Sequence, residues 1–359
     1  MKIVSFSYEN SHKWDDFAMR NDDAWFWYTT DWMQYCLNSQ FGVTTLNRSF
    51  CLIENNSITA LVPLIIEKKK VDGKELAEIF YGGWPTPVPV VETSKSQNKR
   101  DRIYKYIFDN IDNIANENNA QRSVFRIYNA YPIYKRGDIV FNFIMKYGYA
   151  DISLNTQVIN VRLKERDIFN SFNKGSKRNI RKSDKYLTVE FCDYKNNSRD
   201  QYDMFKTFYF RIAGKITRPN ECLEVLYRLI LKGNVFIAFA LYNNSIVGVQ
   251  MVIHYKSGAY YLFSAVEKEF NCCSIGHFLQ WNVIKYLKDK GIDYYEVGIQ
   301  QYGNTIYDFP TEKDINISAF KRRFGGVTVP IFTGEKIYSS EYYQTCFQGR
   351  VNKYLEIMY

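Results

Sequence analysis

The chain has 359 residues, 46% of them hydrophobic and 24% charged, and its formal net charge is +9. This length favours two domains, no apolar run approaches the length of a membrane span, and the first residues lack the apolar core of a signal peptide. We therefore expect a folded protein of the cytoplasm. The positive charge favours an anionic partner, such as the phosphates of a cofactor, a nucleotide-sugar, RNA or an anionic membrane face, unless it serves solubility alone.

Cysteine and histidine usage argues against a metal site. Seven cysteines occur, none in a Cys-x-x-Cys pair, and the three histidines are His12, His254 and His277. Zinc sites draw on clusters of these residue types. We therefore expect reduced, structural cysteines and no metal cofactor.

The first half of the chain contains an ordered set of elements. After an aromatic helical stripe over residues 25–36, two apolar runs within residues 49–66 flank Asn55-Asn56. This pattern predicts a β-hairpin, because Asn tolerates the backbone of tight turns. Three elements follow: a strand over 79–84, an apolar-periodic helix through 103–111 and a strand over 123–131.

Two segments within this half are predicted to be turns or loops. The charged segment Lys68–Gly73 is typical of a turn. Prolines between Tyr81 and Val91 require extended or loop structure there, because proline interrupts helices and sheet ladders. This Gly-Gly-Trp-Pro loop either lines a substrate groove, with Tyr81 and Trp84 as substrate-binding candidates, or is a packed connection.

A strongly basic segment follows the expected domain boundary near residues 148–152. A strand over 151–163 opens the second half, and six cations then recur within residues 169–186. They are Lys174, Lys177, Arg178, Arg181, Lys182 and Lys185. Their spacing places all six on one face of a helix, where like charges repel. A phosphate-bearing ligand explains this choice of residues, and a solvated basic face is the alternative.

The order of elements in the first half recurs in the second. Asn243-Asn244 joins two apolar runs within residues 234–255, and a strand covers 258–266. A helix then runs from a cap at Ser274 to Gly291, and another strand follows it. The repetition indicates duplication, although Asn-Asn turns could also recur by chance in an Asn-rich chain.

Three stretches resemble the FemAB-like branch of the GNAT superfamily, which includes peptidoglycan bridge aminoacyltransferases and N-acyltransferases of cell-envelope polysaccharide genes. They are the basic helix Gly175–Lys185, the turn, helix and strand of Ser274–Gly298, and Ile317–Gly326 with its Phe-Lys-x-x-Phe-Gly-Gly ending. The resemblance implies an α/β (α+β) fold of two tandem GNAT-like units, each a mixed sheet flanked by helices. We expect an N-terminal unit at 1–150, a C-terminal unit with the donor site at 151–336 and a helical tail at 337–359.

The chain departs from the family in three respects. It lacks the sustained heptads that would form the coiled-coil arm of some aminoacyl-tRNA-using members. Glu296 stands where the family strand often has Asp, and Ser274-Ile275-Gly276 is a reduced form of the acetyl-CoA phosphate loop. The resemblance therefore leaves both donor and acceptor open.

Acyl transfer to an amine requires a base for the amine and a group that holds the acyl oxygen, but no protein nucleophile. Glu296, which follows two tyrosines, is the candidate base, or else a salt-bridge partner of the basic stripe. From its place in the Phe-Lys-x-x-Phe-Gly-Gly ending, the resemblance implies that Lys321 holds the oxyanion or the donor phosphate, with Arg322 and Arg323 as alternatives. His277 could relay a proton, or could cap and pack its helix.

Donor binding is assigned to two groups of residues. Arg178, Arg181 and Lys182 would hold phosphates. Ser274 and Gly276 would offer the unpaired N–H groups of a helix start to the donor, unless they form an ordinary helix start.

Tyr302 and Asp308 follow the Glu296 strand and are further substrate-binding candidates.

Three functions stay open at this point. One is N-acyl transfer from acetyl-CoA or another acyl-CoA to an amino group on a nucleotide- or lipid-linked sugar in cell-envelope polysaccharide biosynthesis. The second is aminoacyl or peptidyl transfer from aminoacyl-tRNA, of the peptidoglycan-bridge type. The third is a non-catalytic relative that binds glycan or RNA, and peripheral membrane contact is compatible with any of them.

Overall fold

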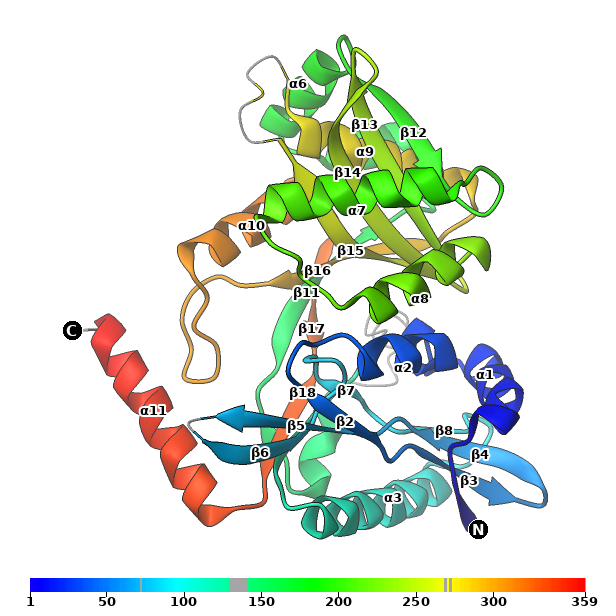
Figure 1. The fold of residues 1–359 in the computed structure, drawn as a ribbon, viewed down its shortest axis with the longest axis vertical. Helices are drawn as coiled ribbons and strands as arrows, with labels where there is room; N and C mark the ends of the chain where they lie inside the picture. The colour runs from blue at the N-terminus through cyan, green and yellow to red at the C-terminus, as the bar shows by residue number, and fades with distance from the viewer. Residues whose placement is uncertain (72, 129–140, 268–269, 271–272, 359) are drawn as a thin grey trace. The chain divides into compact units, whose positions relative to one another are not determined.

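The computed structural model describes the chain except residues 72, 129–140, 268–269, 271–272 and 359 (Figure 1). It divides into two compact units. The first comprises Met1–Leu154, Tyr302–Thr311 and Pro330–Tyr359, and the second comprises Asn155–Gln301 and Glu312–Val329.

This division corrects the expected assignment of residues 151–336 to one unit. Strand β18 (Thr333–Ile337) pairs antiparallel with β9 (Ala120–Arg126), from Thr333↔Arg126 to Ile337↔Arg122. These ladder hydrogen bonds place the segment after Pro330 in the first unit. The loop Tyr302–Thr311 also belongs to that unit.

The first unit contains two sheets. One has the strand order β1 (Lys2–Ser5), β3 (Phe50–Glu54), β4 (Ser57–Val62) and β8 (Val90–Val91). The other has the order β10 (Ala150–Asp151), β18, β9, β6 (Lys74–Ile79), β5 (Ile65–Val71) and β2 (Thr44–Asn47), with β7 (Thr86–Pro87) also paired to β9. Its helices are α1 (Ser11–Arg20), α2 (Thr30–Leu37), α3 (Gln97–Glu117) and α11 (Ser340–Met358).

The second unit is built on one seven-stranded sheet. Its strand order is β12 (Thr188–Cys192), β13 (Val235–Tyr242), β14 (Ser245–Tyr255), β15 (Gly258–Val266), β16 (Tyr294–Gln300), β11 (Leu154–Asn160) and β17 (Val327–Ile331). Its helices are α5 (Glu165–Ser171), α6 (Lys174–Ser183), α7 (Arg199–Ala213), α8 (Asn220–Leu231), α9 (Ile275–Asp289) and α10 (Glu312–Arg322). Figure 1 shows α7 and α8 on one face of this sheet and α9 on the other.

Both predicted Asn-Asn hairpins are present. Asn55 and Asn56 have φ values of 50° and 60°, and Asn243 and Asn244 have 48° and 64°. These left-handed conformations match the right-handed twist of the flanking strands. In the first unit Pro63 separates β4 from β5, because it has no N–H for a sheet ladder, whereas the corresponding β14 runs unbroken.

Three predictions about the first unit need correction. Lys68–Lys70 lie in strand β5, paired with β6, so only Gly73 of the predicted charged turn has a turn conformation, and Asp72 lies outside the described residues. Of the strand predicted over 79–84, only Ile79 lies in a strand, at the end of β6, because Gly82 and Gly83 adopt positive φ in a turn. The strand predicted over 123–131 is β9, which begins earlier, at Ala120, and ends at Arg126. Residues 129–131 lie outside the described residues, as does Cys272.

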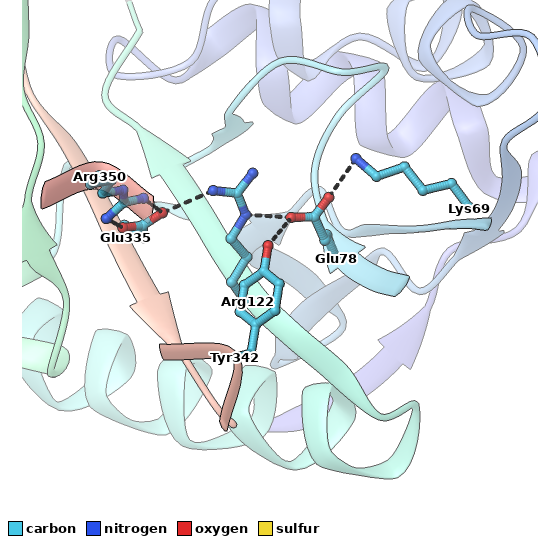
Figure 2. A network of polar contacts seen from close by, with 6 residues as sticks. All are labelled: Lys69, Glu78, Arg122, Glu335, Tyr342 and Arg350. Atoms are coloured by element: carbon cyan, nitrogen blue, oxygen red, sulfur yellow. Dashed lines mark hydrogen bonds and ion pairs between the residues drawn. The ribbon is translucent and has the colours of Figure 1, made fainter. Parts of the chain in front are cut away.

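A polar network around two buried carboxylates attaches α11 to the second sheet of the first unit (Figure 2). It comprises Lys69, Glu78, Arg122, Glu335, Tyr342 and Arg350. Arg350 donates to both carboxylate oxygens of Glu335 at 2.7 Å, and Arg122 Nη1 donates to the same carboxylate at 3.0 Å. The predicted helical tail is therefore held to strands β9 and β18 by paired charges. None of the described helices combines the length and apolar character needed to cross a membrane.

Candidate active site

A groove opens in the second unit where two parallel strands separate. β15 and β16 pair only from Gly258↔Tyr294 to Tyr260↔Glu296, yet β15 continues to Val266 and β16 to Gln300. A register shift against β14 leaves Leu262 as an extra, bulged residue of β15. The groove encloses about 940 Å³ and is bounded by β15, the start of α9, α10 and Tyr209 of α7.

The start of α9 forms one end of this groove. Ser274 and Gly276 both line it. The backbone N–H of Ser274 donates to Ser183 Oγ at 2.8 Å, which joins the end of α6 to the start of α9. A Cβ at Gly276 would lie 3.3 Å from the ring of Phe320, so glycine permits the close approach of α10.

Lys321 extends from α10 into the groove. Its Nζ lies 5.3 Å from the centroid of the Tyr261 ring, a cation–π contact. Gly298, with φ of 94°, leaves room for it, since a Cβ there would be 3.0 Å from Nζ. Burial lowers the pKa of Lys321 to about 8, although the Glu296 carboxylate acts in the opposite direction.

Glu296 lies on β16 at the last paired position before the strands separate. Thr156 Oγ1 donates to its Oε1 at 2.8 Å. Its negative charge acts on Lys321, so the carboxylate and the ammonium predicted from separate motifs belong to one electrostatic pair. Glu296 itself does not border the groove.

His277 is a buried wall of the groove, 8% exposed. Its ring packs edge-on against Phe320, with centroids 5.0 Å apart, and lies 5.5 Å from Phe324. Burial, and secondarily the charge of Arg323, lowers the pKa of His277 to about 4. The imidazole is therefore neutral at pH 7, and its Nε2 has no hydrogen-bond partner among the residues that the structure describes.

The basic helix forms as predicted, but its cations do not border the groove. α6 carries five of the six, and Lys185 follows its end. Its buried side is formed by Ser176, Ile180 and Ser183, so the cations occupy the outer side. Arg178, Arg181 and Lys182 are exposed, and the ion pairs found among the described residues include none of the three.

The four predicted substrate-binding residues lie in the other unit. Tyr81 is buried and pairs with Trp84 in an isolated bridge, and Trp84 is partly exposed. Tyr302 is exposed, and Asp308 pairs with Thr305 across a turn. None of the four lines the groove of the second unit.

Several groove residues escaped the sequence analysis. Gln250 of β14 and Ser264 of β15 line the groove from adjacent strands, and Lys313 and Asn316 line it from α10. α10 has a recognisable sequence signal, with Glu312 and Asp314 in its first turn and Lys321 and Arg322 in its last. Gln250 has no such signal, because it lies within an apolar strand.

Comparison with known proteins identifies this region. Residues 170–309 match the acetyltransferase (GNAT) domain family. The chain contains a GNAT acyltransferase domain. A search of curated proteins found no significant sequence match. The residues described by the structure include no group of three or more His, Cys, Asp or Glu side chains placed to hold a metal ion.

Solved structures share the fold of the whole chain. A crystal structure of FemX matches with a TM-score of 0.65 at 12% identity, covering 97% of this chain and 100% of FemX. The C-terminal domain of a putative lysylphosphatidylglycerol synthetase from Agrobacterium fabrum matches with a TM-score of 0.55 at 12% identity, covering 93% of each chain. A tandem GNAT protein from the clavulanic acid biosynthesis pathway matches with a TM-score of 0.51 at 10% identity, covering 94% of this chain and 98% of that one. The likeness to these structures extends over nearly the whole chain and therefore supports the two-unit fold that the sequence predicted.

Proposed function

We propose that this acyltransferase moves an acyl group from an acyl-CoA to an amino group on a nucleotide- or lipid-linked sugar, in the cytoplasm, during cell-envelope polysaccharide biosynthesis. The observation that carries the proposal is the groove between the separated strands β15 and β16. It brings together the start of α9, the lysine Lys321 with its lowered pKa and, close by, the carboxylate of Glu296, of which the start of α9 and Glu296 lie within the matched GNAT domain.

Donor binding is assigned to the start of α9 and to the cations of α6. Backbone N–H groups at a helix start attract phosphate and carbonyl oxygens. The hydrogen bond between Ser274 and Ser183 holds the end of the basic helix next to this start. Arg178, Arg181 and Lys182 would therefore meet the phosphates of a donor whose acyl end enters the groove.

The acyl-transfer step needs no nucleophile from the protein. Because Glu296 does not border the groove, it accepts a proton from the acceptor amine through one intervening water. The amine nitrogen forms a new bond to the acyl carbon while the carbon–sulfur bond of the thioester breaks. Lys321, in its protonated form, donates a hydrogen bond to the acyl oxygen as negative charge develops on it. The departing thiolate takes up one proton, which balances the proton that the amine lost.

A second donor, aminoacyl-tRNA, is favoured by a specific observation. The exposed cations of α6 form a stripe over which a nucleic acid backbone could run. With this donor, binding should weaken steeply with added salt, because each phosphate contact releases a counterion.

Thermal unfolding with CoA, acetyl-CoA, bulk tRNA and UDP-sugars, each added separately, tests the donor class. A saturating ligand that binds only the folded chain raises its midpoint. A shift with CoA compounds that is reduced by Arg178→Ala, but not by the exposed control Lys195→Ala, supports the proposal. A shift with tRNA alone would replace it with the aminoacyl-tRNA reading.

A further inference from the structure

A buried polar triad lies against the groove of the second unit. It consists of Gln250 on β14, Gln280 on α9 and Tyr295 on β16, and each is at most 2% exposed. Gln250 Nε2 donates to Gln280 Oε1 at 3.1 Å and to Tyr295 Oη at 2.8 Å. Gln280 forms a further side-chain hydrogen bond with Tyr295. Polar groups this deeply buried cost stability unless they are paired, so their presence in an otherwise apolar layer calls for a reason.

The triad fixes the direction of one carbonyl oxygen. Both hydrogens of the Gln250 amide are used by Gln280 and Tyr295, so Oε1 projects to the opposite side of the amide group. Among the described residues Oε1 has no hydrogen-bond partner, and Gln250 is one of the residues that line the groove. Ser264, its cross-strand neighbour on β15, lines the groove as well. The groove therefore contains a hydrogen-bond acceptor of fixed orientation, Gln250 Oε1, that has no donor among the described residues.

The position of the triad assigns this acceptor to the acyl end of the groove. Gln280 lies one turn beyond Gly276 along α9, away from the helix start that is suited to phosphate. Tyr295 directly precedes Glu296, the position at which β15 and β16 separate. A donor whose phosphates lie at the start of α9 would thus bring its acyl group, rather than its phosphates, towards Gln250.

We infer that the transferred acyl group carries a hydroxyl group whose hydrogen it donates to Gln250 Oε1, and that a plain acetyl or alkanoyl group is a poor substrate. This inference rests on the acyl-CoA donor proposed above. A buried acceptor left unpaired disfavours binding of the analogue that lacks the hydrogen, so the discrimination is expected to be roughly tenfold or more.

Butyryl-CoA, 2-hydroxybutyryl-CoA and 3-hydroxybutyryl-CoA form a matched test set, because they differ only in the presence and position of one hydroxyl. Their dissociation constants, measured by calorimetry with the full chain, should favour one hydroxyacyl thioester over butyryl-CoA by about tenfold or more. In Gln250→Leu the preference should fall to within about twofold. Ser245→Ala, at the exposed start of the same strand, should keep it.

Two results would overturn the inference while the proposed function stands: equal binding of all three thioesters to the wild-type chain, or a preference that survives Gln250→Leu. The first comparison requires no variant, so it holds even if Gln250→Leu does not fold. Absence of binding by free CoA and by every thioester would instead refute the acyl-CoA donor, and this inference with it.

Discussion

Lys321 offers the sharpest test of the catalytic assignment, because its charge changes near pH 8. Burial lowers its pKa to about 8, against an ordinary value of about 10.4. With a pKa of about 8, roughly nine-tenths of the side chain is protonated at pH 7 and roughly one-tenth at pH 9. If protonated Lys321 stabilises the acyl oxygen, this contribution to kcat/KM should fall about tenfold between these pH values.

The assay is acyl transfer from a saturating donor between pH 6 and pH 10, for the wild type and for Lys321→Arg. Arginine keeps its charge over this range, so the ratio of wild-type to variant rates cancels the titration of the acceptor amine. The ratio should decline through pH 8. In Glu296→Gln the carboxylate that raises the Lys321 pKa is lost, so any residual activity should decline at lower pH. A ratio that rises through pH 8 would show that neutral Lys321 acts as a base, and would refute the oxyanion assignment.

Three further predictions follow from the geometry. Glu335→Gln should lower the free energy of unfolding in urea by about 2–3 kcal/mol, since it removes the charged partner of Arg350 and one of the two carboxylates that pair with Arg122, while Asp109→Asn in an exposed pair should change it by less than about 1 kcal/mol. The pKa of His277 is lowered to about 4 from an unfolded value near 6.5, so its contribution to stability is present above pH 6.5 and is lost as the pH falls towards 4. The wild type should therefore lose more stability over this interval than His277→Phe. Equal losses in the two proteins would contradict the burial argument. Gly298→Ala should reduce kcat at least tenfold, because the residue has φ of 94° and a methyl group there would contact Lys321 Nζ, whereas Gly303→Ala, with open space around it, should leave kcat unchanged.

Local chemistry explains which parts of the fold the sequence could reveal. Asn55-Asn56 and Asn243-Asn244 favour the left-handed backbone conformation of a tight turn and lie between apolar runs, so both hairpins were predictable from adjacent residues. The basic helix was predictable for a similar reason, because the spacing of its cations indicates which side of the helix faces outwards. Lys68–Lys70 misled the prediction, because the pairing of β5 with β6 outweighs the preference of charged residues for turns.

Features that depend on distant pairing could not be read from the sequence. β18 joins β9 across more than 200 residues, and only this ladder shows that the segment after Pro330 belongs to the first unit. Gln250 resembles an ordinary interior strand position until Gln280 and Tyr295 are placed against it. The sequence did supply Lys321, from the family resemblance, and Glu296, from its place after two tyrosines on a strand, but not the electrostatic effect of one on the other.

The two units differ at the feature on which donor binding depends. In the first unit β6 and β9 are parallel partners from Ala77↔Ala120 to Ile79↔Ser123, the counterpart of β15 and β16. Beyond Ser123, however, β7 pairs with β9 at Thr86↔Phe125 and Pro87↔Arg126. In the second unit β15 no longer pairs with β16 beyond Glu296. In the first unit β7 pairs with the corresponding part of β9. The similar order of elements in the two units therefore does not extend to the groove, which supports the proposal that the donor binds to the second unit.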